Sequence, residues 1–394
     1  MKNIPTLSDI NIKNKFVLLR SDLNSDIKDG KILPSERIKQ SAITIKELKK
    51  KGAKVVIIAH QGRPDSSDFT SLYEHSKQLN KYIKVMYVND LVGEEALGAI
   101  KNLMPGEALL LDNIRFNKDE MNPSSKKNSL VEFFCKNKDF KFEYYINDAF
   151  SVCHREQTSI TEFPKHIKSV IGRVMERELA ALENLRLRDA NCLFILGGAK
   201  PEDNIKLLKS KNKIITGGIF GQVCTLAKGK NLGAQNKFLA KQIKDLPKII
   251  TKIKPQSKSI QTPSDFAVKG KNDSRIELKL EEFPSQFEIY DIGKITIDQY
   301  VKEISKAKAV YMKGPLGYCE DEKFSTGTIT ILNEIAKRTK ENKLFSLIGG
   351  GHLSNAFARA NLNEKDFSHI SLSGGALLSF IAGEKLPGLE VLKK

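Results

Sequence analysis

Cysteine is scarce in this sequence, and its spacing excludes two kinds of structural crosslink. The 394 residues include five cysteines, an odd number that lie far apart and never form a C-x-x-C pair. A disulfide framework needs pairs and a structural zinc site needs closely spaced ligands, so neither is expected. We predict that the cysteines are core residues in a reducing compartment.

Long hydrophobic runs and two phosphate-binding signatures are missing as well. No stretch approaches the ~18 apolar residues of a membrane-spanning helix, and Met1–Pro5 does not resemble the start of a signal peptide. Neither G-x-x-x-x-G-K-[ST] nor a G-x-G-x-x-G after a strand pattern occurs. A cytoplasmic protein is expected, with no P-loop and no dinucleotide site.

Acidic residues are fewer than basic residues. Lys and Arg number 65 against 47 Asp and Glu, which gives a formal net charge of +18. This excess fits binding of nucleic acid or phosphoesters, but the lysines are spread along the chain, which fits a solvated surface equally well. The sequence has no recognition-helix, RRM or zinc-finger signature, so no nucleic-acid partner is expected.

The length and the order of apolar runs predict the fold class. A chain of 394 residues is too long for one ordinary core, since domains usually hold about 100–200 residues. Runs such as Phe16–Leu19, Val55–Ala59 and Leu193–Leu196 suit buried strands, and helical patterns lie between them. We expect an α/β protein with two doubly wound parallel-sheet (Rossmann-like) domains joined by a helix and hinge. The boundary is placed near residue 170, before the helical stretch Arg173–Leu187.

Polar side chains follow the apolar runs of the first half. The carboxyl ends of parallel strands meet at one edge of a sheet, where ligands bind. Arginine offers a planar fork of donors that matches carboxylate and phosphate oxygens. His60 and His154 stand in the same segments, where a ligand role and a structural role both remain open. The arginines expected to hold a small polyanion are Arg37, Arg63, Arg115 and Arg155.

Glycines follow the apolar runs of the second half. A turn without side chains lets the backbone approach a ligand, and free N–H groups at a helix start can hold phosphate, although each pair alone also fits a tight turn. The turns are Gly197–Lys200, Thr216–Gly218, Lys313–Gly317, Gly349–His352 and Ser373–Ala376.

These two halves together indicate phosphoryl transfer between a nucleotide and a small anion. Such a reaction needs chiefly positioning and charge neutralisation. Arg37, Lys200, the glycine amides and Mg²⁺ would supply them.

Ordered motifs then connect the chain to a known family. They are R-S-D-L-N, H-Q-G-R-P, D-N-I-R-F, N-D-A-F-x-x-x-H-R, G-G-A-K, G-P-L-G-Y-C-E, G-G-G-H and H-I-S-L-S-G-G-A. From about Val17 to Leu389 the sequence resembles phosphoglycerate kinases. H-Q-G-R-P, G-R-V-M-E-R-E-L and G-G-G-H resemble the archaeal branch, in which His stands where most other members have Asp.

The resemblance implies a glycolytic and gluconeogenic transferase. It would move the γ-phosphoryl group of ATP reversibly to the carboxylate of 3-phosphoglycerate, giving 1,3-bisphosphoglycerate and ADP, with Mg²⁺ bound through the nucleotide. No general base is required, because a carboxylate is already deprotonated near pH 7. Residues 1–170 would bind 3-phosphoglycerate and 171–375 the nucleotide, while 376–394 would pack back on the first domain. A cytoplasmic monomer with no membrane partner is expected.

The resemblance also assigns site residues. Those expected to hold 3-phosphoglycerate are Asp22, Asn24, Arg37, His60, Arg63, Arg115 and Arg155. Lys200 is expected to bind the nucleotide at the transferred phosphoryl group. Gly217 and Gly218 would border the adenine, and Glu320 would bind the ribose. The residues expected at the phosphates are Gly349, Gly350, Gly351 and His352. The catalytic set is Arg37, Lys200, Gly374 and Gly375, and no protein metal ligand is assigned.

Several positions depart from the family pattern, mostly in the nucleotide half. Lys313 replaces an Asn before Gly-Pro, and Leu372 and Ser373 replace Thr-Gly. Pro201 and Glu202 stand where Val and a small or acidic residue are usual, and Asp26 stands where Pro is usual. The alternative is therefore a protein of this fold that binds ligands or regulates, with little turnover.

Overall fold

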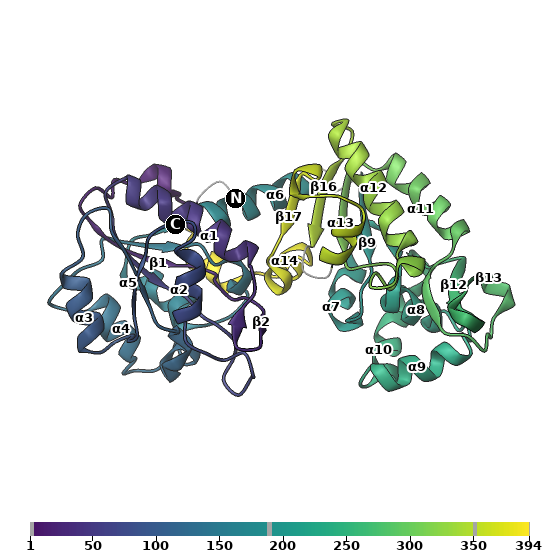
Figure 1. Ribbon diagram of the computed structural model, residues 1–394, viewed down its shortest axis with the longest axis horizontal. Coiled ribbons are helices and arrows are strands. Elements are labelled where there is room, and N and C mark those ends of the chain that lie inside the picture. The colour runs from purple at the N-terminus through teal and green to yellow at the C-terminus, as the bar shows by residue number, and fades with distance from the viewer. Residues whose placement is uncertain (1–3, 187–190, 350–352, 394) are drawn as a thin grey trace. The chain divides into compact units, whose positions relative to one another are not determined.

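The computed structural model describes residues 4–186, 191–349 and 353–393, and the chain divides into two compact units (Figure 1). Unit 1 contains Met1–Ala180 and Glu384–Lys394, and unit 2 contains Ala181–Gly383. Within the described residues each unit has one parallel sheet of six strands, so the predicted α/β class with two parallel-sheet domains is confirmed. The sequence predicts domain boundaries at residues 170 and 375. These boundaries, and the ligand that each domain would bind, stay predictions.

The sheet of unit 1 has the strand order β5-β6-β4-β1-β7-β8. Its strands are short, continuous apolar runs, as expected where both faces are covered. A short antiparallel hairpin, β2 (Ile27–Lys28) and β3 (Lys31–Ile32), follows the first strand of this sheet in the sequence. The sheet strands are β1 (Phe16–Arg20), β4 (Lys54–Ile58), β5 (Met86–Val88), β6 (Ala108–Leu111), β7 (Tyr144–Asn147) and β8 (Ser169–Ile171).

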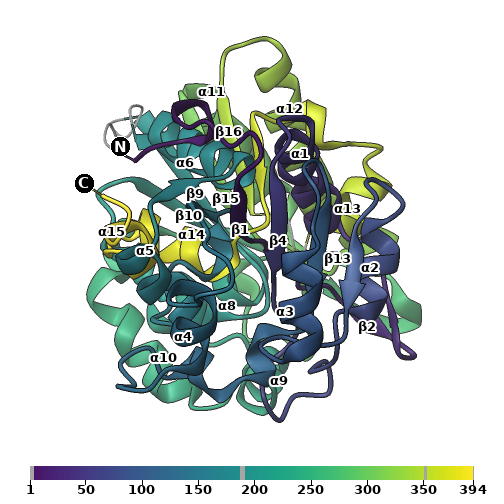
Figure 2. The ribbon, with the colours of Figure 1, turned by 90° about the vertical axis from the view of Figure 1, so that its left-hand side faces the viewer.

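Helices cover both faces of this sheet. Alternate residues of the strands point to opposite faces, so Leu19 packs with α1, whereas Leu18 packs with α3 and α4. In Figure 1, α1 and α2 lie on one side of β1 and α3 and α4 on the other, and Figure 2 has α3 and α4 toward the viewer. The helices are α1 (Glu36–Lys50), α2 (Tyr73–Leu79), α3 (Glu94–Lys101), α4 (Ser129–Cys135), α5 (Phe163–His166), α6 (Arg173–Arg186) and α15 (Pro387–Glu390).

The sheet of unit 2 has the strand order β11-β10-β9-β15-β16-β17. Its central strands are fully apolar until their last residues, and one face packs against α11 and α12. The sheet strands are β9 (Cys192–Leu196), β10 (Lys213–Thr216), β11 (Ile260–Gln261), β15 (Ala309–Lys313), β16 (Phe345–Gly349) and β17 (His369–Ser371).

A second, antiparallel sheet in unit 2 was not anticipated from the sequence. It has the order β13-β12-β14 and the bounds β12 (Asp265–Lys269), β13 (Arg275–Lys279) and β14 (Ile289–Ile292). Its strand β13 lacks an apolar run, which is why the pattern of buried strands missed it. The helices of unit 2 are α7 (Pro201–Ile205), α8 (Gly218–Ala227), α9 (Ala234–Gln242), α10 (Leu246–Ile253), α11 (Lys294–Lys306), α12 (Thr326–Lys340), α13 (Ser354–Arg359) and α14 (Gly374–Ile381).

Helix α6 carries the chain from one unit into the other. Its start is held by the buried Asp148, whose Oδ1 accepts from the backbone N–H groups of Val174 and Met175 at 2.8 and 3.0 Å. An added Cβ at Gly172 would lie 2.3 Å from that oxygen, so the glycine is needed for the close approach. Burial raises the pKa of Asp148 to about 6. The division between the units falls inside this helix, after Ala180.

The C-terminal segment belongs to unit 1. The N–H of Gly388 in α15 donates to the carbonyl of Cys153 at 2.9 Å. A Cβ at Gly388 would lie 2.6 Å from Ile160, which indicates close packing there. Among the described helices, none is long and apolar enough to cross a bilayer.

Candidate functional site

The carboxyl ends of four strands bring the polar segments of unit 1 to one edge of its sheet. Arg20, the last residue of β1, is in register with Ile58 of β4 and Asn147 of β7, so the segments that follow begin side by side. We call the basic side chains at this edge the arginine cluster. Each lies near enough to His60 or Arg115 to influence its pKa. The members are Arg20, Arg37, Arg63, Arg115 and Arg155.

Asp22, Asn24 and Arg37 form one connected group. The Nε atom of Arg37 lies 3.4 Å from Asp22 Oδ2, which also accepts from the hydroxyl of Ser151 at 2.7 Å. Arg37 Nη1 donates to the carbonyl of Asn24 at 3.0 Å. The side-chain oxygen of Asn24 accepts from the N–H of Gly62 at 2.9 Å, which ties the segment after β1 to the segment after β4.

The segment after β4 is fixed by Gln61. Its Oε1 accepts from the N–H of Ser25 at 2.9 Å and lies 2.8 Å from His75 Nε2, and its amide donates to the carbonyl of Ser25 at 3.0 Å. Gly62 has φ of +66°, and a Cβ there would lie 2.6 Å from the backbone of Asp68. Glycine is therefore required, and the turn aims the following arginine.

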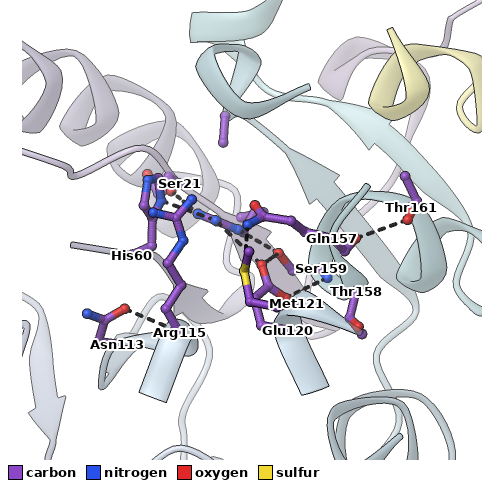
Figure 3. Close-up of polar contacts among 12 residues, drawn as sticks. Ser21, His60, Asn113, Arg115, Glu120, Met121, Gln157, Thr158, Ser159 and Thr161 are labelled. Carbon is purple, nitrogen blue, oxygen red and sulfur yellow. Dashed lines mark hydrogen bonds and ion pairs between the residues drawn. The ribbon is translucent and has the colours of Figure 1, made fainter. Parts of the chain in front are cut away.

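His60 is connected through Arg20 to the buried acid Glu120. Figure 3 shows His60, Ser159 and Glu120. Arg20 Nη2 lies 3.2 Å from His60 Nδ1, and its Nε donates to the hydroxyl of Ser159 at 2.8 Å. That hydroxyl donates to Glu120 Oε1 at 2.7 Å, and Glu120 is 3.9 Å from Arg20 with neither side chain exposed. Because a guanidinium can only donate, His60 Nδ1 is an acceptor and its proton is on Nε2.

His60 is expected to stay neutral throughout pH 6–8 and to offer Nε2–H as a donor. Burial first, and then the surrounding arginines, hold the pKa of His60 well below its usual value. Lowering the pH through about 6.5 protonates this histidine in the unfolded chain but not in the folded one. The free energy of unfolding should therefore fall, while the ring in the folded protein stays uncharged. Side-chain ¹⁵N spectra, assigned with a His60→Gln variant among the six histidines, should show a fixed Nε2–H tautomer. Titration of this ring between pH 6 and 8 would contradict the assignment.

Arg115 is a buried cation whose hydrogen bonds are incomplete. It is 4% exposed, and Nη1 donates to the carbonyl of Gly62. Its Nε and Nη2 have no partner among the residues that the structure describes. Burial and then the charges of Arg20 and Arg155 lower the pKa of the guanidinium. A buried donor or charge without a partner is costly, so this arrangement is suited to receive an anion.

The remaining arginines of the cluster differ in exposure. Arg63 is exposed, whereas Arg155 is half-buried, and burial followed by the charge of Arg63 lowers the pKa of Arg155. Sequence reasoning did not assign Arg20 or Glu120 to the site. Arg20 could have been recognised from the sequence, because it is a charged residue at the end of an otherwise apolar strand.

In unit 2 the first two glycine turns pack against one loop. The N–H groups of Gly198 and Gly218 donate at 2.8 Å to the carbonyls of Pro315 and Leu316. A Cβ at Gly217 would lie 2.6 Å from Leu316, and one at Gly218 would lie 2.6 Å from the carbonyl of Pro315. These N–H groups are already hydrogen-bonded within the protein, so they are not free to bind a ligand. The glycines could still contribute to a ligand site because they have no side chains.

The other expected nucleotide residues lie at the same edge of this sheet or just beyond it. Lys200 is exposed and precedes α7, and Gly374 and Gly375 are exposed at the start of α14. Glu320 is exposed, and its Oε2 accepts from the hydroxyl of Tyr318 at 2.7 Å. Gly349 ends β16. Three residues lie outside the described ranges, namely Gly350, Gly351 and His352.

Two parallel-sheet units, one with the arginine cluster and one with glycine turns at the strand ends, define a phosphotransferase that acts on a small anion. Residues 7–384 match the model of the family described as phosphoglycerate kinase. The chain belongs to the phosphoglycerate kinase family, which confirms the resemblance seen in its motifs.

Relatives and solved structures agree with this assignment. The chain is 39% identical to phosphoglycerate kinase of Saccharolobus solfataricus, over 99% of this chain and 97% of the relative. It is 37% identical to that of Methanothermus fervidus, with the same coverage. The crystal structure of phosphoglycerate kinase from Pyrococcus horikoshii OT3 matches with a TM-score of 0.86 and 36% identity, over 99% of this chain and 98% of that chain.

Proposed function

We propose that this protein transfers a phosphoryl group reversibly between ATP and the carboxylate of 3-phosphoglycerate, giving 1,3-bisphosphoglycerate and ADP. The observation that carries the proposal is the buried Arg115 guanidinium with two donor atoms unpartnered among the described residues. A substrate with a phosphate and a carboxylate would supply the missing hydrogen-bond acceptors. Membership of the family supports the same pair of substrates.

The arginine cluster is proposed to hold 3-phosphoglycerate. Arg63 and Arg115 would grip its phosphate, since two guanidinium forks can enclose one such group. Arg155 and the neutral N–H donor of His60 would complete the anion site. Asp22 and Asn24, tied together through Arg37, would orient the hydroxyl and carboxylate end of the substrate. The carboxylate attacks without a base, because it is already ionised near pH 7.

Unit 2 is proposed to bind ATP and ADP. Glu320 would accept from the ribose hydroxyls, and Gly217 and Gly218 would leave room for the adenine. The exposed start of α14, at Gly374 and Gly375, would offer free N–H groups to the phosphates. Lys200 is proposed to neutralise charge on the transferred group, and Arg37 to do the same from the acceptor's side. Gly349, Gly350, Gly351 and His352 are proposed to border the phosphates.

Magnesium is proposed to arrive with the nucleotide. No group of three or more His, Cys, Asp or Glu side chains that could hold a metal occurs within the described ranges. A Mg²⁺ ion held mainly by phosphate oxygens and water does not need one, and it would neutralise charge on those oxygens. A cytoplasmic monomer is part of this proposal.

A coupled assay tests the function directly. With ATP and Mg²⁺ we expect ADP to form only when 3-phosphoglycerate is present, and glycerate without its phosphate to be a poor substitute because it cannot satisfy Arg115. The ligand-binding alternative, which family membership does not favour, would instead give binding of both ligands in calorimetry and no ADP. Absence of turnover at high protein concentration would refute the proposed reaction.

A further inference from the structure

The loop that carries Glu320 lies against the antiparallel sheet of unit 2. This loop, residues 314–325, connects β15 to α12. The backbone N–H of Tyr318 donates to the carbonyl of Tyr290 in β14 at 2.7 Å, and the two rings pack edge to face with their centroids 5.7 Å apart. The hydroxyl of Tyr318 in turn donates to Glu320 Oε2 at 2.7 Å. The position of Glu320 therefore depends on how the loop is held against this sheet.

The buried acid Asp291 of β14 contacts the chain at both ends of this loop. It is 1% exposed, and its Oδ2 accepts from the N–H of Gly327, just beyond the loop, at 2.8 Å. A Cβ added at Gly317, near the start of the loop, would overlap Asp291 Oδ1, so the backbone passes directly against the carboxylate. Burial raises the pKa of Asp291 to about 6, whereas hydrogen bonds from Gly327 and Arg275 lower it. The acid needs these donors to stay ionised near neutral pH.

Arg275 of β13 connects this acid to the loop. Its Nη1 donates to Asp291 Oδ2 at 2.9 Å and to the carbonyl of Lys323, within the loop, at 2.8 Å. Its Nη2 donates to the carbonyl of Ile292 at 3.1 Å, and its Nε donates to Glu277 Oε1 at 2.9 Å. One guanidinium thus joins β13, β14 and the loop. The planar fork of arginine allows this, whereas a single ammonium group would not.

We propose that Arg275 is a positioning residue that holds residues 314–325 so that Glu320 accepts from the ribose hydroxyls, and that it thereby sets the preference for ribonucleotides. The inference rests on the proposed function of unit 2. The guanidinium acts through the loop and not on the ligand. A carboxylate accepts about four hydrogen bonds, so Glu320 can bind a diol while it keeps Tyr318. Such bonds weaken steeply with distance and angle, so a displaced loop loses the hydroxyls first.

Calorimetry with ADP and with 2′,3′-dideoxy-ADP, which lacks both ribose hydroxyls, tests this role. In the wild type the Kd for the dideoxy compound should be about ten- to a hundredfold higher, as expected for hydrogen bonds to a charged group. Arg275→Met should raise the Kd for ADP about three- to thirtyfold, the range for residues that act without touching a ligand, and leave the dideoxy compound within about twofold. Arg275→Lys keeps a cation beside Asp291 but loses the fork, so its ratio of the two Kd values should lie between those of the wild type and Arg275→Met.

Glu277→Gln is the matched control, because it removes the exposed partner of the same guanidinium and leaves the contacts with Asp291 and Lys323. An exposed ion pair contributes little, so ADP affinity should stay within about twofold. The proposal is overturned if Arg275→Met binds ADP normally, or if it weakens both nucleotides alike, which marks a structural role. Equal binding of both nucleotides by the wild type also overturns it, since Glu320 would then not contact the ribose hydroxyls. Failure of the proposed function looks different, because the wild type would then form no ADP from ATP with 3-phosphoglycerate.

Discussion

Replacing Lys200 by Met should lower kcat by about 10² to 10⁴ while KM for ATP changes little. Cationic groups that serve the oxygens of a phosphoryl group in transfer stabilise the transition state more than bound ATP, and their loss has effects of this order. The exposed ammonium group at the start of α7 is suited to this role, because it can approach a ligand without breaking a contact in the core.

Steady-state kinetics, with ADP affinity measured separately by calorimetry, distinguishes three roles for Lys200. A transition-state role lowers kcat, a simple binding role raises KM and leaves kcat unchanged, and a solvated lysine changes neither. Lys209→Met is the matched control, since Lys209 is an exposed lysine that follows α7 and has no proposed role. An unchanged kcat would remove Lys200 from the catalytic set.

Replacing Arg115 by Ala should weaken 3-phosphoglycerate binding by about 2–4 kcal/mol, the cost of removing one partner of a buried charge pair. Arg115 is 4% exposed, and two of its donor atoms have no hydrogen-bond partner among the described residues, so we expect the substrate to bind them. Arg63 is exposed, and Arg63→Ala should have a smaller effect, about 1–2 kcal/mol. ADP affinity should stay within about twofold, because sites that share no partner behave independently.

Calorimetry with each ligand separately checks this result. Arg115→Lys keeps the positive charge but loses the fork, and should still bind 3-phosphoglycerate more weakly than the wild type. Arg338→Ala, at the end of α12 in unit 2, controls for the general loss of a positive charge. Equal losses of affinity for 3-phosphoglycerate and ADP would show that the substrate does not bind to the arginine cluster.

The sequence predicted the residue types of the site better than their contacts. Arginines after the first-half strands and glycines after the second-half strands could be recognised because turn chemistry and apolar runs are local patterns. The glycine turns were expected to offer free N–H groups to a ligand, yet the N–H groups of Gly198 and Gly218 donate to Pro315 and Leu316. Their partners lie about a hundred residues away, and no local pattern reports a contact over such a separation.

The sequence alone determined the α/β class and the family, since both follow from ordered motifs and from apolar runs long enough to form buried strands. Only the tertiary structure decided which charges are balanced. Arg20 meets Glu120, and Lys313 meets Asp203, across long separations in sequence. Arg115 is buried with donors that no described residue satisfies. Burial and pairing set the free energy of a charge, and both arise when strands far apart in the chain become neighbours in a sheet.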